Sequence, residues 1–172
     1  MKRVALLMAL PVLVGAVAGS PRELGKKDGA CRPGETGPAL LVTARGLKDH
    51  TGNLKLEIYP PTDPDFLSDD ATLVNAGKTF RRVEVPVPAG SEPELCIRVP
   101  AAGTYALMLL HDRNKDHKFH WTGDGIGFGS NPTLGFGQPK AAVSRVTAGP
   151  GLTRVSVTLT YLRGLRMRPL RE

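Results

Sequence analysis

The feature that most restricts the fold of this chain is a series of short segments in which apolar and polar side chains alternate. The segment 54–59 alternates in this way, the segment 80–87 has valine at every second position from Val83, and the segment 95–99 repeats the pattern. The chain has 20 glycines and 15 prolines, many of which separate these segments. A period of two is typical of half-buried β-strands, and no stretch shows a convincing helical period.

One further segment is apolar at every position from Tyr105 to Leu110, which predicts a central strand covered on both faces. Pro86 and Pro88 predict an edge strand, because proline cannot donate to a neighbouring strand. A turn containing Gly52 predicts that the first two strands form a hairpin. One helical turn is expected within 63–70. About seven strands follow, at 40–45, 54–59, 80–87, 95–99, 104–110, 141–147 and 152–161.

This pattern predicts an all-β fold, a single antiparallel β-sandwich of the immunoglobulin-like or prealbumin-like kind, with a barrel as the alternative. The chain divides into an N-terminal segment 1–18, an irregular lead 19–38 rich in glycine, proline and charge, the sandwich domain 39–161, and a basic C-terminal tail 162–172. A domain of this length can bury a core without help from a partner.

The segment 1–18 resembles a secretory signal peptide. Lys2 and Arg3 precede an uncharged run that ends at Ala18 in a small-x-small pattern, so cleavage after Ala18 is expected. The run is shorter than the ~20 residues that span a bilayer, and an uncleaved anchor is the alternative. We therefore predict an exported protein, periplasmic or secreted, that is not an integral membrane protein.

The charge of the chain limits its partners. The formal net charge of +7 falls to +5 when residues 1–18 are removed, and part of the excess lies in the tail. A basic tail can contact an anionic envelope surface, and a solvated terminus is the alternative. Aromatic residues make up only 5% of the chain and do not alternate with basic ones, which argues against nucleic-acid binding.

The two cysteines, Cys31 and Cys96, predict one disulfide bond in an exported protein. Cys31 lies in the lead and Cys96 in an expected strand, so the bond would join the lead to the sheet. The cysteines lie far apart in the sequence and form no CxxC motif, which argues against a redox or zinc site.

The loop after the central strand carries the strongest candidate for a binding site. Asp112, Asn114 and Asp116 offer oxygen atoms at alternate positions, as in the first half of a calcium loop, where the carbonyl of Lys118 would follow. His117 stands where a glycine is expected, and Asp124 would have to replace the usual final glutamate. A polar turn, in which these side chains bind backbone amides, is the alternative. Ca²⁺ is the cofactor that these oxygen ligands would suit, and the sequence establishes none.

The same loop contains His111, His117 and His120, a set that could hold a transition-metal ion or could simply be exposed. The loop also contains glycines at 123, 125, 127 and 129, which we expect to allow left-handed turns or close packing. Aromatic residues nearby suggest a platform for a sugar or a peptide, with packing under the loop as the alternative. The candidate platform residues are His111, Trp121, Phe128, Asn131 and Phe136.

No motif of an enzyme stands out. The chain has no G-x-S-x-G motif, and its candidate carboxylates lie within one turn of each other rather than as a separated acid–base pair. We therefore expect a non-enzymatic binding or structural module of the envelope. A calcium-like metal-binding protein and an unrecognised hydrolase are the alternatives.

Several motifs, taken in order, are similar to a bacterial family called domain of unknown function 2141. They are the stretch from Gly103 to Ala106, the pair His111-Asp112 with the polar turn after it, the glycine-rich stretch 125–131, and 136–139. The resemblance extends over about 39–161, and it departs from the family pattern at His117 and at an inserted Gly129. It implies an exported β-sandwich and no known activity.

Overall fold

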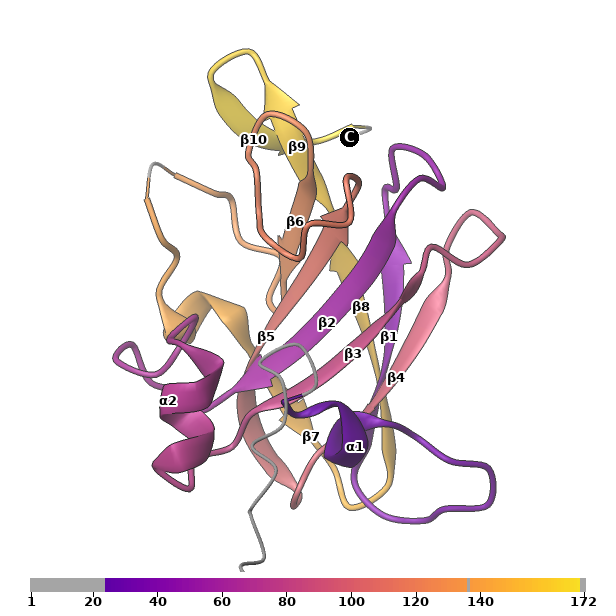
Figure 1. Ribbon diagram of the computed structural model, residues 1–172, viewed down its shortest axis with the longest axis vertical. Coiled ribbons are helices and arrows are strands. Elements are labelled where there is room, and N and C mark those ends of the chain that lie inside the picture. Colours follow the sequence, from indigo (N-terminus) through magenta and orange to yellow (C-terminus); the bar gives the residue numbers. More distant parts are fainter. Residues whose placement is uncertain (1–23, 136, 171–172) are drawn as a thin grey trace, which may run out of the picture.

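Two β-sheets packed face to face form the molecule, and the computed structural model describes residues 24–135 and 137–170 (Figure 1). The smaller sheet has the order β4-β1-β8, and the larger has the order β10-β9-β6-β5-β2-β3, with β7 paired to β5. The sandwich prediction is confirmed, with ten strands in place of about seven. The strands are β1 (Ala39–Arg45), β2 (Asn53–Tyr59), β3 (Arg81–Pro86), β4 (Glu94–Arg98), β5 (Gly103–Asp112), β6 (Gly125–Phe128), β7 (Arg145–Ala148), β8 (Leu152–Thr158), β9 (Thr160–Arg163) and β10 (Arg166–Pro169).

The expected hairpin between the first two strands is wrong, because β1 and β2 lie in different sheets. β1 pairs with β4 in antiparallel orientation and with β8 in parallel orientation. β2 pairs instead with β3 and β5. Alternation in the sequence identifies the buried side of a strand but not its neighbour, and here Val42 and Leu56 belong to one core that lies between the sheets.

β5 is the central strand, as predicted, and it separates two hydrophobic cores. Leu107 and Leu109 belong to the inner core between the sheets. Met108 and Leu110 face the other way and belong to an outer core, together with Phe128 and residues of the segments that cover the larger sheet. The continuous apolar run therefore reflects burial on both faces.

The outer core is covered partly by the short helix α2 (Asp70–Asn75) and the turns before it. Asp69 caps this helix by accepting a hydrogen bond from the amide of Thr72, at 2.8 Å. The helix begins at Asp70, the last residue of the segment 63–70 in which one helical turn was expected. Phe66 and Leu73 extend from this region onto the sheet and are almost completely buried.

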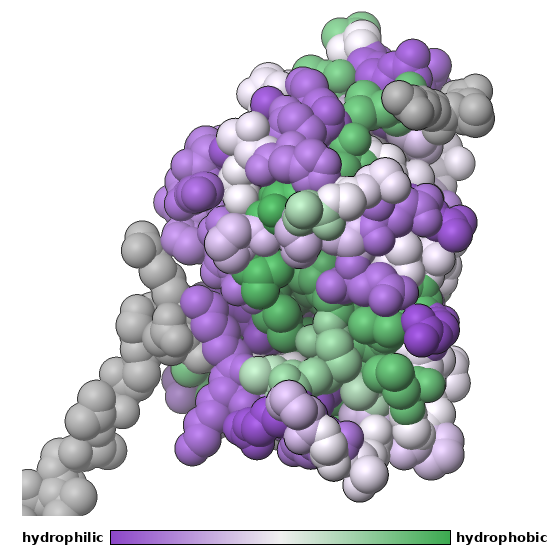
Figure 2. Space-filling view, turned by 90° about the vertical axis from the view of Figure 1, so that its right-hand side faces the viewer, coloured by the Kyte–Doolittle hydropathy of each residue, from purple (hydrophilic) through white to green (hydrophobic). Residues whose placement is uncertain are grey.

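β3 forms one edge of the larger sheet, as its prolines predict. Its valines are only half-buried and pack against the inner core. Figure 2 shows the side of the molecule on which β1 and β4 lie in Figure 1. On this side a band of hydrophobic surface lies between hydrophilic flanks. The inner core thus approaches the surface where β3 and β4 contact each other.

The expected strand 152–161 is divided, because the chain passes from one sheet to the other at Leu159. β8 ends at Thr158 in the smaller sheet, and β9 begins at Thr160 in the larger sheet. Leu159 is fully buried, and its amide donates to the carbonyl of Arg45 at 2.9 Å. The segment after Tyr161 is not a frayed tail, since β9 and β10 pair from Arg166 to Pro169.

The glycine-rich stretch contains a strand, β6, which the sequence did not predict. A side chain at Gly125 would overlap the ring of Tyr161, and a Cβ atom at Gly127 would lie 2.6 Å from a methyl group of Val157. Glycine at these positions lets β6 lie close to the neighbouring chain segments, which confirms the expectation of close packing.

The N-terminal lead is attached to the smaller sheet by the disulfide bond between Cys31 and Cys96, which confirms that prediction. The lead also contains a short helix, α1 (Lys26–Gly29), and Ala30 forms an isolated β-bridge to Ile97. Among the described residues, no helix has the length and apolar character needed to cross a bilayer. The expected signal peptide, 1–18, lies outside the described residues.

Candidate functional site

The loop that follows β5 is held in shape by hydrogen bonds from its own backbone amides. Asp112 Oδ2 accepts from the amide of His117 at 2.8 Å, Asn114 Oδ1 from that of Asp116 at 3.3 Å, and Asp116 Oδ1 from that of Lys118 at 2.9 Å. Lys115 and His117 have left-handed backbone angles, with φ of 61° and 67°. The oxygen atoms expected to bind calcium thus serve in the polar turn that was the alternative.

Asp124 closes this loop rather than joining the other carboxylates. Its Oδ1 accepts from the amide of Arg113 and its Oδ2 from the amide of His120, both at 2.9 Å. The side chain is 2% exposed. These bonds fix the two ends of the loop to each other. The calcium site expected from Asp112, Asn114, Asp116, Lys118 and Asp124 stays a prediction.

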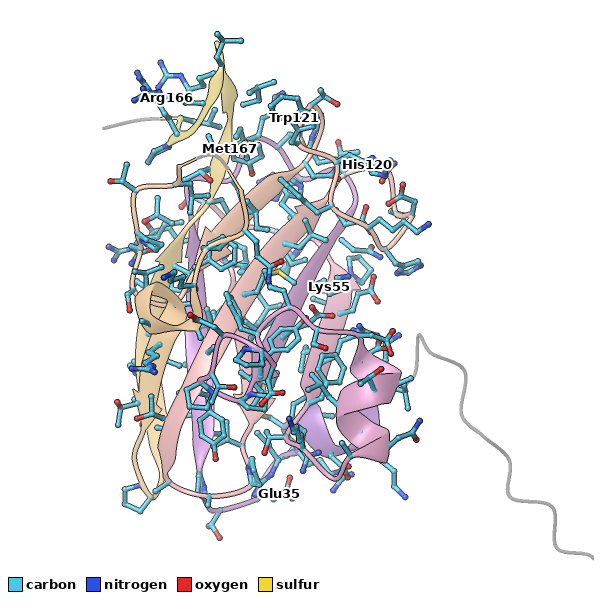
Figure 3. The ribbon with its side chains drawn as sticks, turned by 90° about the vertical axis from the view of Figure 1, so that its left-hand side faces the viewer. Glu35, Lys55, His120, Trp121, Arg166 and Met167 are labelled. Atoms are coloured by element: carbon cyan, nitrogen blue, oxygen red, sulfur yellow. A yellow bond between two sulfur atoms is a disulfide. The ribbon has the colours of Figure 1, made fainter. Side chains whose placement is uncertain are left out.

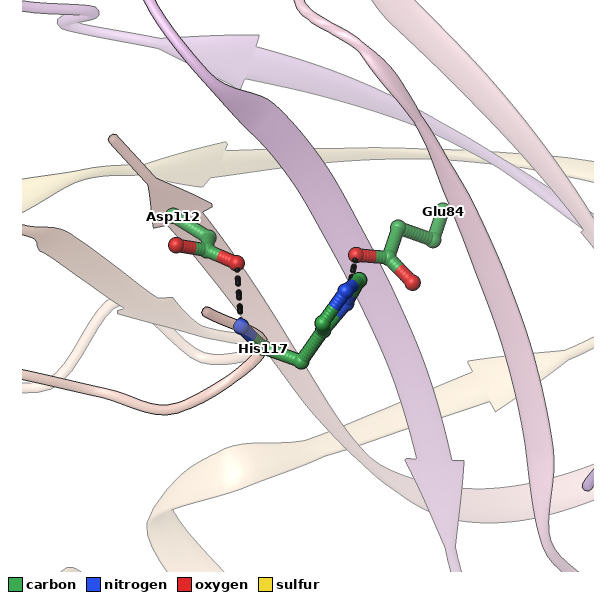
Figure 4. A group of neighbouring side chains, drawn as sticks. All are labelled: Glu84, Asp112 and His117. Carbon is green, nitrogen blue, oxygen red and sulfur yellow. Dashed lines mark hydrogen bonds and ion pairs between the residues drawn. The ribbon is translucent and has the colours of Figure 1, made fainter. Parts of the chain in front are cut away.

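The structure does bring Asp112 to two other side chains that can bind a metal ion. Glu84 of β3, Asp112 at the end of β5 and His117 of the loop each offer one ligand atom, and these atoms lie within 4.8 Å of one another (Figure 4). His117 Nδ1 lies 2.6 Å from Glu84 Oε1. Sequence reasoning missed Glu84, because a glutamate on the polar side of an edge strand gives no signal of a site.

Burial alone would raise the pKa of Glu84, yet its pKa is lowered. Hydrogen bonds from the His117 ring and from Asn53, together with the charge of Lys26, outweigh the burial. Lys26 Nζ lies 3.6 Å from Glu84 Oε2. The carboxylate is thus ionised at neutral pH although its side chain is only 5% exposed.

The three histidines of the loop do not converge. His111 Nδ1 and Nε2 lie 2.7 Å from Tyr161 Oη and from the carbonyl of Thr51. His120 Nε2 instead lies 2.6 Å from Asp116 Oδ2 in an exposed pair. Since His117 contacts Glu84, each ring has a different partner, and the structure does not assemble a three-histidine site.

His111 is predicted to make the stability of the fold depend on pH. Burial lowers its pKa from the ordinary value of 6.5, although the Thr51 carbonyl and Asp49 act in the opposite direction. The unfolded chain therefore takes up this proton first as the pH falls. The stabilisation is complete above about pH 6.5 and is lost progressively below it.

Urea unfolding at pH 7, 6 and 5 tests this prediction. We expect the free energy of unfolding to fall over this range in the wild type, and to fall less in the variant His111→Gln. His50→Gln is the control, because His50 is exposed and its ring Nδ1 lies 3.0 Å from the carbonyl oxygen of Pro88. If the free energy of unfolding depended on pH equally in the wild type and in His111→Gln, His111 would not be the cause of the pH dependence.

An apolar groove lies at the other end of this loop. It has a volume of about 620 Å³, and its floor is formed by Ile126 and Phe128 of β6. Phe119 and Trp121 come from the loop, and Met167 comes from β10. Figure 3 shows Trp121 and Met167 at the same end of the molecule.

Exposed apolar side chains are concentrated at this groove. Six large apolar side chains are exposed among the described residues, and three of them line it, namely Phe119, Trp121 and Leu165. Leu67, also in the lining, has a left-handed φ of 58°, which is uncommon for a bulky residue. Clusters of this kind mark binding surfaces on proteins.

The groove includes only part of the platform expected from the sequence. Trp121 and Phe128 line it, whereas His111 of β5 is fully buried and does not line it. Asn131 lines an adjoining hollow of about 420 Å³ and bonds to the backbone of Ser156 and Thr158. Phe136 lies outside the described residues. Met167 and Leu165 were missed because the tail was not expected to fold back.

Comparison with known proteins identifies a family but no close relative. Searches of curated proteins and of solved structures gave no match. A family model of uncharacterized proteins conserved in bacteria matches residues 42–156, which include strands of both sheets and the loop described above but not β9 and β10. The match confirms the resemblance seen in the motifs and extends over more than half of the chain. The chain therefore belongs to the bacterial family called domain of unknown function 2141.

Proposed function

We propose that this protein is an exported, non-enzymatic binding module of the envelope whose groove holds an amphiphile, an apolar chain with an anionic head of the fatty-acid kind. The observation that carries the proposal is the apolar groove of about 620 Å³ with its exposed aromatic wall. Pockets for small ligands typically have volumes of about 300–1,000 Å³ and mostly apolar linings.

The groove exists because exposed apolar side chains stand beside the outer core of the larger sheet. Phe66, from the turns before α2, packs against Tyr59 and Phe128 of the outer core. Phe119, Trp121 and Leu165 line the groove beside this core and stay exposed. An apolar chain placed there would bury surface that water now contacts. The gain is about 25 cal/mol for each Å² of apolar surface removed from water.

The charges around the groove favour an anionic head. Arg166 lines both the groove and the adjoining hollow, and Arg168 lines the hollow. No aspartate or glutamate lines either one within the described part of the chain. Arginine is well suited to binding carboxylate and phosphate groups.

Export and the lack of enzymatic activity are supported by separate observations. A disulfide bond is typical of proteins that fold outside the reducing cytoplasm, and the sequence has the features of a signal peptide. No serine, cysteine or histidine lines the groove among the residues described, so a ligand there would meet no usual nucleophile or general base.

Trp121 is the only tryptophan of the chain, so its fluorescence reports on the groove directly. We expect sub-micellar dodecanoate to shift the emission of Trp121 to shorter wavelength with saturation. We expect dodecanol, which lacks the charge, to bind more weakly. Arg166→Gln is expected to weaken binding of dodecanoate while leaving that of dodecanol unchanged.

A matched pair of exposed leucines provides the control. Leu165 is 80% exposed and lines the groove, and Leu152 is 56% exposed and lies in β8. Leu165→Glu is expected to weaken dodecanoate binding at least tenfold, and Leu152→Glu is expected to have no effect. Binding that does not saturate, or that Leu165→Glu leaves intact, would refute the proposal.

A further inference from the structure

Buried charged side chains lie on the outer face of the larger sheet, away from the groove. Asn53 and Lys55 of β2, Glu84 of β3 and Asp112 of β5 lie on this face at one end of the sheet, where the strands pair with one another. The loop carrying His117 covers them, and Lys55 Nζ donates to the carbonyl of His117 at 2.8 Å. A polar group with so little access to water needs partners within the protein.

Asp112 lacks one of these partners. Its side chain is fully buried, and Oδ2 accepts a single hydrogen bond, from the amide of His117. Oδ1 has no hydrogen-bond partner and is the one such buried side-chain atom among the described residues. A buried carboxylate with one neutral donor is costly unless a proton or a cation compensates its charge.

His117 links this carboxylate to a second one. Its amide contacts Asp112 and its ring contacts Glu84, so a single residue bridges β3 and the end of β5 (Figure 4). The left-handed backbone of His117, with φ of 67°, accompanies these two contacts. A positive φ is uncommon for residues other than glycine, although histidine adopts it more often than most.

We infer that Glu84, Asp112 and His117 form a binding site for a divalent transition-metal ion such as Zn²⁺. Ligand atoms around a tetrahedral zinc ion lie about 3.4 Å apart, given bonds of about 2.1 Å. The three ligand atoms already lie within 4.8 Å of one another, and the ion would separate His117 Nδ1 from Glu84 Oε1, which are now 2.6 Å apart. The imidazole nitrogen favours zinc over calcium, which takes oxygen ligands.

The charges around the site set how the ion binds. The carboxylates of Glu84 and Asp112 supply two negative charges. The ion would lie between the His117 ring and Glu84, in place of the hydrogen bond that now joins them. Lys26 Nζ, which lies 3.6 Å from Glu84 Oε2, adds a positive charge beside the site. Lys55 points at the carbonyl of His117, and water completes the coordination of the ion.

This site differs from the calcium site expected from the sequence, although both use Asp112. The zinc site needs Glu84 and His117, whereas the calcium loop needs Asn114 and Asp116. The exposed pair of His120 and Asp116 is a matched control, because its contact of 2.6 Å equals that of His117 and Glu84. The two pairs differ in burial, with side-chain exposures of 52% and 37% against 29% and 5%.

Isothermal titration of the purified, disulfide-bonded protein with Zn²⁺ and with Ca²⁺ tests the inference. We expect one equivalent of Zn²⁺ to bind and to raise the melting temperature, with the rise reversed by a chelator. Glu84→Gln and His117→Asn are each expected to weaken binding at least tenfold, and Asp116→Asn and His120→Asn are expected to leave it unchanged.

Visible absorption of bound Co²⁺ gives a second readout for any variant whose stability changes, because a change of ligand alters the spectrum even when the affinity is preserved. We expect the spectrum to change in His117→Asn and to stay the same in His120→Asn. Failure of Zn²⁺ to bind, loss of binding in Asp116→Asn or His120→Asn, or a rise in melting temperature with Ca²⁺ alone would overturn the inference.

Discussion

The variant Glu57→Ala is expected to lower the free energy of unfolding by about 3–5 kcal/mol, because it removes one partner from a buried ion pair. Glu57 is 2% exposed on β2. Its carboxylate accepts hydrogen bonds from Tyr59 Oη and Arg82 Nε, both at 2.6 Å, and Lys55 Nζ lies 3.8 Å away. The substitution leaves Lys55 buried without this carboxylate.

Glu57 also connects the outer face of the sheet to the segments that cover it. Arg82 of β3 contacts Glu57 and donates to Asp70 of α2 at 2.8 Å, so one guanidinium joins two strands and the helix. We therefore expect Glu57→Ala to loosen α2 as well as to destabilise the sheet. Hydrogen exchange of the amides in α2 would show this loosening.

Urea unfolding of Glu57→Ala and of Glu94→Ala measures the effect against a control. Glu94 pairs with Arg154 at 3.3 Å, with side-chain exposures of 46% and 71%. An exposed pair of this kind contributes about 0–1 kcal/mol. Similar losses in the two variants would show that burial of the Glu57 network adds nothing to the stability.

Removal of the disulfide bond is expected to have an effect of similar size. The bond closes a loop between cysteines separated by 65 positions, and chain entropy then predicts a loss of about 4 kcal/mol in the double variant Cys31→Ala, Cys96→Ala. The helix α1, which precedes Cys31, contacts β3. We expect proteolysis of the double variant to begin near the lead.

Unfolding of the wild type under reducing conditions serves as the control for this prediction, because it breaks the bond without changing the sequence. Its stability should fall to that of the double variant. A double variant as stable as the oxidised wild type would show that the lead is held by its other contacts.

The local sequence pattern was sufficient to predict those features of the fold that depend on residues close together in the chain. The alternation of apolar and polar residues located most of the strands, and Pro86 and Pro88 predicted that β3 lies at an edge. The run from Tyr105 to Leu110 marked β5 as the strand buried on both faces. The pair of cysteines gave the disulfide bond.

Features that depend on distant residues could not be predicted in this way. β6 was missed because glycine has a low strand propensity, and its suitability at Gly125 appears only when Tyr161 lies against it. The change of sheet at Leu159 likewise gives no local signal, since the residue is apolar in either arrangement.

The sequence alone determined that the chain is an all-β domain with a polar loop after its central strand, because burial of alternate side chains is a local property. The tertiary structure decided what that loop can do. It brought Glu84 to Asp112 and His117, separated His111 from the other histidines, and folded Met167 back over Phe128. Pairing between strands that are far apart in the sequence sets these contacts, and no local pattern encodes it.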